Sequence, residues 1–343
     1  MENHALRAWM DSVEPFLDPL VDIARSFTDL TGVPVDLPTT LFLRAQLAGL
    51  ERPSSTSANG SCHLLQATDG WAAVNLARPD DLAAVPALLA LLGSPDEPGG
   101  LHAAVRRNTA AEVVEAAQLL GIAAAVPGSA QGTRPAVRAE RWGEPRIRAM
   151  TGIRIVDFSA RWAGPLCARL LGLAGARVVK VESATRPDGA RFGTPAFYCW
   201  LHDGHDNLVV DFAPGALDEI VAEADVVIEA SRPRALRRLG LRAEEFLAAR
   251  PGRGWVGITG YGRENDRIAF GDDAAVAGGL MGYDPNGDPV FLGDALADPV
   301  TGVFAAHAAA RSLAAGGGEL LCVSMAACAA TLADTRTRAQ PPC

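Results

Sequence analysis

The 343-residue sequence is acidic: 40 Asp and Glu residues against 31 Lys and Arg residues give a net charge of −9 at pH 7. A chain of this length with 49% hydrophobic residues can bury one large core or two modest ones, which argues against disorder and against a fibre. The acidic balance excludes the basic footprint of a nucleic-acid-binding protein, although a local group of arginines can still hold an anionic ligand. The basic side chains are 30 arginines and a single lysine, Lys180.

The cysteines and the N-terminus bear on the compartment. The six cysteines fall at no short paired spacing, and a chain of this size needs no disulfides for stability. The first 19 residues lack the apolar run of a signal peptide, and the apolar run of residues 82–92 is interrupted by Pro86. We therefore expect reduced thiols, a cytoplasmic location and no membrane span.

The first half of the chain predicts helices followed by a small α+β unit. In residues 1–50, apolar side chains such as Leu17 and Leu20 recur at three- and four-residue spacing, which is typical of helices. A hairpin of residues 62–66 and 71–76 is expected after them, followed by two helices at residues 79–92 and 109–120. A polar stretch at 128–148 suits a linker. We expect residues 1–150 to form a small α+β domain with these N-terminal helices.

From residue 151 onwards, short β-branched runs alternate with helical stretches. The expected strands are residues 153–158, 177–182, 207–211, 225–229, 255–259 and 319–324. Most segments between them are long enough for a crossover helix, which is the pattern of a parallel sheet covered on both faces. The prediction for residues 151–343 is a Rossmann-like large domain, and the fold class of the whole chain is α/β.

In such a sheet, ligands bind beyond the carboxyl ends of the strands, so the first strand-to-helix turn is a candidate site. It contains Arg161, Trp162 and Ala163, followed by Gly164, which permits close backbone approach, and Pro165, which suits a first helical turn. The dinucleotide fingerprint G-x-G-x-x-G is missing, which argues against a tightly bound NAD or FAD. Amides at the helix start can still receive a phosphate or carboxylate, but a turn shaped only for packing fits equally well.

Four arginines lie within seven positions after the fourth predicted strand, at Arg232, Arg234, Arg237 and Arg238. The fixed fork of donors on arginine suits phosphates. Most charge runs are solvated helix faces, but the place of this one after a strand end favours ligand contact.

Asp298 directly precedes a helix expected from Pro299, so its position is that of an N-cap. A carboxylate there can also act as a nucleophile, since aspartate forms acyl intermediates when the attacked group is activated. His202 and His205 form an H-x-x-H, but no further ligand falls at zinc-like spacing, so we expect no metal site.

Several runs follow one another in a specific order over nearly all of residues 152–330. They are G-I-R-I-V-D-F at 152–158, A-G-P at 163–165, K-V-E at 180–182, D-x-x-R at 188–191, R-P-x-x-L-x-R-L-G-L at 232–241 and A-D-P-V-T-G at 297–302. In this order they resemble the family III CoA-transferases, which are related to the α-methylacyl-CoA racemases. Residues 64–71 and 109–127 resemble the small domain of that family, which normally follows the large domain but here precedes it. The chain therefore resembles a circular permutation, or two halves of such proteins joined in reverse order.

The resemblance implies a Rossmann-like large domain, a small domain and a homodimer of interlocked subunits. It implies that Asp298 attacks an acyl-CoA thioester to give a mixed anhydride and CoA thiolate, and that an aspartyl-CoA thioester then passes CoA to a second carboxylic acid. Coenzyme A is then a substrate rather than a tightly bound cofactor, and the expected partners are acyl-CoA and carboxylate small molecules. The residues implied to contact CoA are Arg161, Trp162, Ala163, Arg191, Arg232 and Arg238, and Asp273 is expected near the substrate.

Some positions depart from the family pattern and keep two alternatives open. His202 and His205 replace its N-x-x-K, which alters the expected CoA contacts. A 2-methylacyl-CoA racemase needs a His-Asp pair as bases. In this sequence Asp272 stands at the position expected for the histidine and Asp273 follows it, which argues against the racemase. A catalytically silent scaffold is the third hypothesis, which the retained Asp298 opposes. Lys180 closes the second predicted strand, where an ion pair and a ligand contact both remain open.

Overall fold

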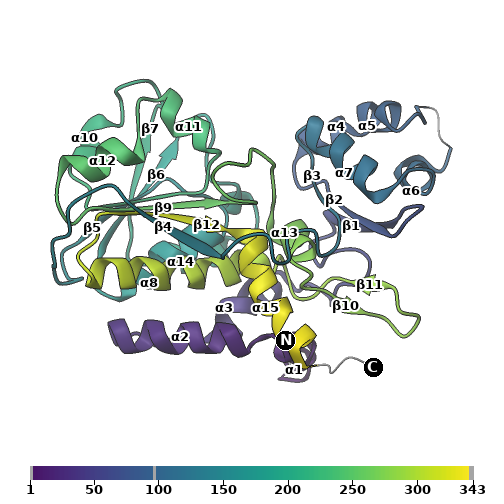
Figure 1. Cartoon of the computed structure of the whole chain (residues 1–343), viewed down its shortest axis with the longest axis horizontal. Helices are drawn as coiled ribbons and strands as arrows, with labels where there is room; N and C mark the ends of the chain where they lie inside the picture. The colour runs from purple at the N-terminus through teal and green to yellow at the C-terminus, as the bar shows by residue number, and fades with distance from the viewer. Residues whose placement is uncertain (1–2, 96–97, 340–343) are drawn as a thin grey trace.

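The computed structural model describes residues 3–95 and 98–339, and a seven-stranded sheet forms its larger part (Figure 1). The strands are β4 (Val137–Arg141), β5 (Arg154–Asp157), β6 (Arg177–Ser183), β7 (Asp206–Val210), β8 (Val226–Glu229), β9 (Gly254–Thr259) and β12 (Glu319–Ser324). Their order across the sheet is β4-β12-β9-β8-β5-β6-β7, and only the β12–β4 pair is antiparallel. This confirms the prediction of a mostly parallel sheet in an α/β fold.

Helices cover both faces of the sheet because its central strands are apolar on both sides. Ile155 of β5 packs toward α8 (Ala163–Leu173) and α14 (Ala297–Ala314), whereas its neighbour Val156 packs toward the opposite face. That face is covered by α10 (Asp218–Ala222), α11 (Pro233–Arg238) and α12 (Ala243–Ala249). Between β6 and β7 lie η2 (Gly189–Phe192) and α9 (Pro195–Leu201).

The chain runs from β5 outward through β6 to β7 and then returns to β8 on the other side of β5. The strand order therefore reverses between β5 and β8, which is where open α/β sheets form a crevice at the carboxyl ends of their strands. The turns that contain Arg161 and Arg232 both open into this region.

A smaller region contains the antiparallel strands β1 (Cys62–Gln66), β2 (Trp71–Asn75) and β3 (Ala123–Ala125). Its helices are α4 (Pro79–Ala83), α5 (Val85–Leu91), α6 (Gly100–Val105) and α7 (Ala110–Leu119). The expected helix at residues 79–92 is thus two helices, because the chain bends at Ala84, just before Pro86. Leu65, Val113 and Ile122 belong to a separate core of this region.

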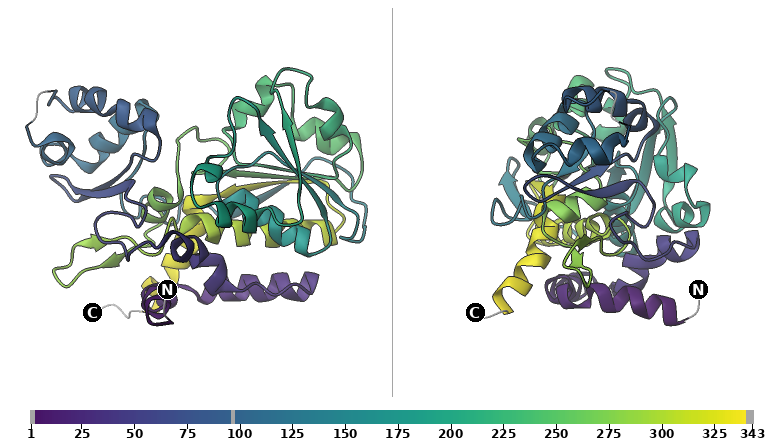
Figure 2. Two further views of the ribbon diagram at one scale, coloured as in Figure 1. Left: turned by 180° about the vertical axis from the view of Figure 1, so that it is seen from behind. Right: turned by 90° about the vertical axis from the view of Figure 1, so that its right-hand side faces the viewer.

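The N-terminal helices pack on the large sheet region and not on the small one (Figure 2). They are α1 (Asn3–Val13), η1 (Glu14–Phe16), α2 (Asp18–Thr31) and α3 (Leu37–Ala48), and α15 (Met325–Ala339) lies beside them. Leu20 and Phe27 share one core with Val303 and Ala306 of α14. Small side chains on α14 allow helices to approach it closely from the side away from the sheet. The division of the chain at residue 150 stays a prediction.

The stretch expected to be a linker contains the edge strand β4. The sequence of β4 predicts a loop because the side chains of an edge strand can stay polar and exposed. The remaining elements are α13 (Gly271–Ala277) and the hairpin of β10 (Gly282–Tyr283) and β11 (Pro289–Val290), which lies below the small region in Figure 1. Among the described helices, none is both long enough and apolar enough to cross a membrane.

Candidate active site

Asp298 lies in the first turn of α14, at its junction with α13. The helix begins at Ala297, and its N-cap is Leu296, so the prediction that the Asp298 side chain caps this helix was wrong. The backbone N–H of Asp298 instead donates to the carbonyl of Ala295 (2.8 Å), and its carboxylate accepts from the N–H of Gly271 at the start of α13. The carboxylate is thereby aimed at the first turn of a second helix while its side chain stays partly exposed.

The turn before Asp298 is tightly constrained. Ala295 adopts a left-handed conformation (φ 46°), which is unusual for a residue other than glycine. Its N–H donates to Asp272 Oδ1 (3.0 Å), and Asp272 Oδ2 accepts from Asn59 Nδ2 (3.2 Å). A Cβ atom on Gly271 would lie 2.5 Å from Asp298 Oδ2, so only glycine permits this approach. Asp272 and Gly271 together hold the position of Asp298.

Charges of both signs surround the Asp298 carboxylate. Burial raises its pKa to about 6, and the neighbouring cations Arg44 and Arg161 oppose this rise while Asp294 adds to it. A carboxyl group with this pKa is largely ionised at pH 7 yet poorly hydrated, which is the state of a good nucleophile.

Arg44 reaches this site from α3, far away in the sequence. Its Nε donates to Asp294 Oδ2 (2.7 Å), its Nη2 donates to the other oxygen, and Asp294 is fully buried. The guanidinium also lies over the Trp162 ring, 4.8 Å from its centroid. The pair places the charge of Arg44 beside Asp298, and sequence reasoning missed it because nothing in the sequence links residues 44 and 294.

Arg161 and Trp162 lie where the turn after β5 enters the site. The backbone of Arg161 adopts a left-handed conformation (φ 73°), and its N–H donates to Asp188 Oδ1 (2.8 Å). Its guanidinium lies 4.7 Å from the centroid of the Phe270 ring, the residue before Gly271. Trp162 is buried, and Ala163 begins α8. The structure thus brings the predicted turn and Asp298 together.

Arg78 approaches the same aromatic ring from the small region, and sequence reasoning missed this residue as well. Its guanidinium lies 5.6 Å from the Phe270 centroid, pairs with Asp81 (2.5 Å) and donates to the carbonyl of Gly121 (2.6 Å). Phe270 therefore contacts arginines from both regions.

Asp273, the residue after Asp272 in α13, is fully buried. Its Oδ1 accepts from Asn75 Nδ2 (2.9 Å) and from the N–H of Phe270 (2.9 Å), so the carboxyl group faces β2 and its own helix start. Burial is the main cause that raises the pKa of Asp273 and of Asp272 to about 7. A direct role of Asp273 next to the substrate stays a prediction.

The other three arginines that we expect to contact CoA lie in three different surroundings. Arg191 pairs with Glu182 (2.7 Å), and Arg238 is exposed on α11. Arg232 lines a cavity of about 760 Å³ between α7 and the loop after β9, together with Arg234 and Arg267. Arg232 Nη2 also lies near Gly121, whose carbonyl binds Arg78. Of these three candidates, Arg232 is the one that lines this cavity.

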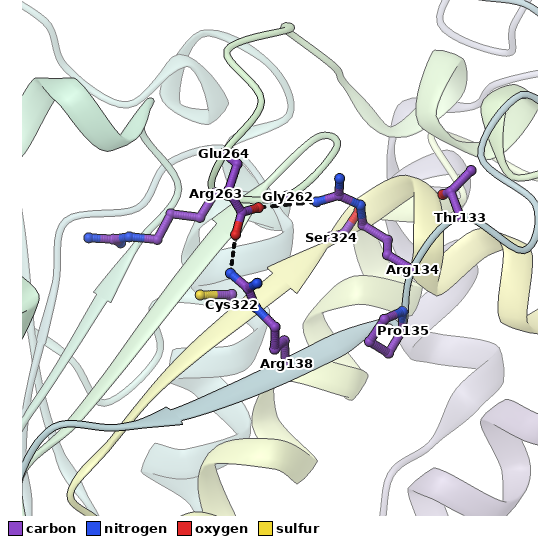
Figure 3. A pocket seen from close by; sticks show the side chains of 9 residues that line it. All are labelled: Thr133, Arg134, Pro135, Arg138, Gly262, Arg263, Glu264, Cys322 and Ser324. Carbon is purple, nitrogen blue, oxygen red and sulfur yellow. Dashed lines mark hydrogen bonds and ion pairs between the residues drawn. The ribbon is translucent and has the colours of Figure 1, made fainter.

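A second cavity, of about 420 Å³, opens at the ends of β9 and β12 (Figure 3). Arg134 and Arg138 point toward Glu264 from opposite sides and pair with it, while Arg263 pairs with Glu229 (3.3 Å). Each of these arginines is therefore neutralised by an acidic neighbour.

The two histidines of the H-x-x-H lie between α9 and β7, where His202 is buried and His205 is half-buried. Their Nδ1 atoms lie 3.4 Å apart, and burial lowers the pKa of His202 to about 3 and of His205 to about 4. Both rings are therefore neutral at pH 7. In the described part of the chain, no group of three or more His, Cys, Asp or Glu residues could hold a metal ion.

The chain is similar to known proteins over part of its length. The model of CoA-transferase family III matches residues 150–340. An acyl-CoA transferase of Fusarium pseudograminearum is 31% identical over 180 residues, 46% of this chain and 40% of that protein. The succinyl-CoA–L-malate CoA-transferase beta subunit of Chloroflexus aurantiacus is 34% identical over 172 residues, 45% of this chain and 42% of that protein. The chain spans less than half the length of these relatives.

Among solved structures, the hypothetical protein Rv3272 from Mycobacterium tuberculosis resembles this chain with a TM-score of 0.51 and 26% sequence identity. The similarity covers 57% of this chain and 59% of that one.

Proposed function

This chain belongs to CoA-transferase family III, and we propose that it moves CoA from an acyl-CoA to a carboxylic acid, with Asp298 as the nucleophile. The observation that carries the proposal is the partly exposed Asp298 carboxylate, which lies at two helix starts between Arg44 and Arg161. Positive helix ends and guanidinium groups both stabilise the ionised carboxylate.

The proposed reaction has four balanced steps. The Asp298 carboxylate attacks the thioester carbonyl, and the C–S bond breaks to leave an acyl-aspartyl anhydride and CoA thiolate. The thiolate attacks the aspartyl carbonyl, which releases the first carboxylate and forms an aspartyl-CoA thioester. The second carboxylic acid, as its carboxylate, attacks this thioester to form a new anhydride and thiolate. Attack of the thiolate on the new acyl carbonyl yields the new acyl-CoA and restores Asp298. Three covalent intermediates, two anhydrides and one thioester, thus replace one difficult exchange.

The surroundings of Asp298 suit these steps. The oxygen of each tetrahedral intermediate becomes negative, and the N–H of Gly271 and the guanidinium groups of Arg44 and Arg161 are the donors and cations at hand. Asp294 fixes the guanidinium of Arg44, the Phe270 ring contacts that of Arg161, and the Gly271 N–H lies at the start of α13. Little reorganisation is therefore needed as charge develops.

We place the nucleotide end of CoA in the cavity of about 760 Å³ at Arg232, Arg234 and Arg267. Arginines suit its phosphates. From there the pantetheine arm would pass Gly121 and the Phe270 ring, which Arg78 and Arg161 flank, to bring the thioester to Asp298. The roles of Arg191 and Arg238 in CoA binding stay part of the proposal, as does a homodimer of interlocked, permuted subunits in the cytoplasm.

The test traps the intermediates. The purified chain is incubated with an acyl-CoA and hydroxylamine, which converts an anhydride or thioester at Asp298 into a hydroxamate that mass spectrometry of peptides detects. Asp298→Asn should abolish the adduct, whereas Asp284→Asn in the exposed hairpin loop should retain it. If no carboxylate is labelled while Cα deuterium exchange of a 2-methylacyl-CoA occurs, the racemase hypothesis replaces ours. If calorimetry shows no CoA binding at all, the silent scaffold replaces it.

A further inference from the structure

The guanidinium of Arg161 is a cation beside Asp298 that lacks an acidic partner. The other two arginines of the site are occupied: Arg44 pairs with Asp294 and Arg78 with Asp81. No carboxylate within residues 3–95 and 98–339 forms an ion pair with Arg161, and its side chain is exposed. A fixed cation without a partner next to a nucleophile leaves one anion to be supplied from outside.

The backbone holds Arg161 in place by an unusual conformation. Its left-handed φ of 73° is unfavourable for a residue with a side chain, and such strain persists where neighbouring structure enforces it, often at functional sites. Asp188 enforces it by accepting the N–H of Arg161 (2.8 Å), and Asp188 is itself fixed by the buried Lys180 (3.1 Å). The turn is therefore built to aim this side chain.

The contact with Phe270 then orients the guanidinium of Arg161. It lies 4.7 Å from the centroid of the Phe270 ring on one side, and on another it faces Gly189, where even an added Cβ would be 3.7 Å from Cζ, so no side chain covers it there. An aromatic contact of this kind leaves the edge of the guanidinium fork open, and that edge is the part that binds a carboxylate through two parallel hydrogen bonds.

We propose that Arg161 binds a second carboxylate of the substrate, so that the acids exchanged are dicarboxylic acids and the donors are their CoA monothioesters. This inference rests on the proposed function. One carboxyl carbon of the substrate reacts at Asp298, while the other carboxylate pairs with Arg161 and fixes the acyl chain between them. Without Arg161, the acidic side chains Asp272, Asp294 and Asp298 would repel such a substrate.

A CoA phosphate is a poorer partner for Arg161. Arg161 lies at the reacting end of the site, next to Phe270 and Gly271, whereas the phosphates of CoA are separated from its thiol by the whole pantetheine arm. The arginines of the larger cavity meet the phosphates better.

The experiment compares two donors and two acids that differ by one carboxylate. Succinyl-CoA and butyryl-CoA have acyl chains of equal length, and succinate and butyrate are the matching free acids. In the wild-type chain we expect succinyl-CoA to react with the lower KM and succinate to bind more tightly in calorimetry. Arg161→Gln should lower kcat with both donors, because Arg161 also lies beside Asp298. The ratio of the KM for succinyl-CoA to the KM for butyryl-CoA should in addition rise by about ten- to a hundredfold, the cost of a charged hydrogen-bonded pair that only succinyl-CoA makes. Arg161→Lys should restore part of the preference, and Arg25→Gln on the exposed face of α2 should have no effect.

Each other outcome overturns the proposal. Equal binding of succinate and butyrate to the wild-type chain contradicts it, as does a weaker affinity of folded Arg161→Gln for free CoA, which would assign Arg161 to the carrier. Binding of the free acids needs no turnover. A failure of the transfer reaction with a retained preference for succinate would therefore refute the proposed function and leave the Arg161 site standing.

Discussion

Lys180 and Asp188 form a fully buried ion pair, with Lys180 Nζ 3.1 Å from Asp188 Oδ2. The other oxygen of Asp188 accepts from the N–H groups of Arg161 (2.8 Å) and Ala190 (2.9 Å). Lys180 also donates to the carbonyl of Ser159. The single lysine of the chain therefore ties the middle of β6 to the turn that carries Arg161, and its burial fits the ion pair and not a direct ligand contact.

Lys180 substitutions should lower stability even when charge is kept. Lys180→Met leaves the carboxylates of Asp188 and Asp157 buried without their cation, and we expect a loss of about 3–5 kcal/mol in the free energy of unfolding. Lys180→Arg places a larger group in a fully buried position and should cost about 1–3 kcal/mol. Urea unfolding measures both, with Arg177→Met on the exposed start of β6 as control. Wild-type stability of Lys180→Arg would show that only charge matters there.

Gly271→Ala should remove most of the activity. The new Cβ would clash with the carbonyl oxygen of Ala295 and lie 2.5 Å from Asp298 Oδ2, so the turn before Asp298 must shift and the carboxylate must lose the Gly271 N–H. Loss of one such hydrogen-bond donor corresponds to a decrease of about a hundredfold in kcat. Gly254→Ala in β9, where the nearest side-chain atom would be 3.5 Å away, is the matched control. Wild-type kcat for Gly271→Ala would rule out this geometry as the active one.

The acid limb of the pH profile should report Asp298 and respond to Arg44. Because the pKa of Asp298 is about 6, kcat/KM should fall about tenfold per pH unit below that value as the nucleophile becomes protonated. Arg44 lowers this pKa, Arg161 does so less, and Asp294 raises it, so Arg44→Gln should shift the limb to higher pH.

Arg44→Lys retains the charge, so its acid limb should return at least part of the way to the wild-type pH. The control Arg25→Gln should have its acid limb at the wild-type pH. Circular dichroism must show that Arg44→Gln is folded, since Asp294 then lacks its partner. A limb that stays at the same pH in a folded Arg44→Gln would contradict the role of Arg44.

The sequence indicates the sheet and the proposed nucleophile Asp298, but not the charges that tune the pKa of its carboxylate. Alternating β-branched runs and crossover segments predict the parallel strands, because each such strand must bury both faces. The Arg44–Asp294 pair joins elements 250 positions apart, and Arg78 enters from the other region, so no local pattern reveals either contact. The cap prediction for Asp298 failed because the helix begins at Ala297.

Buried Asp273 should contribute a fall in stability as the pH rises from about 4 to about 7, and Asp273→Asn should remove it. This contribution is opposite in sign to that of the histidines His202 and His205. The folded-state pKa of Asp273 is about 7, whereas an unfolded aspartate titrates near about 4. Between these values the folded chain binds the proton more tightly. The contribution to stability is therefore complete below about pH 4 and is lost as the pH rises through about 7. Asp272 adds a second proton in the same window.

Each such proton contributes a slope of up to about 1.4 kcal/mol per pH unit to the free energy of unfolding. In the Asp273→Asn variant, the side-chain amide oxygen can still accept from Asn75 and Phe270, so the fold should persist. The slope of the unfolding free energy between about pH 4 and 7 should become more positive by up to one proton. Urea unfolding at a series of pH values measures this slope, with Asp29→Asn on the exposed face of α2 as control. An unchanged slope in Asp273→Asn would show that Asp273 is already ionised in the folded chain at pH values well below 7.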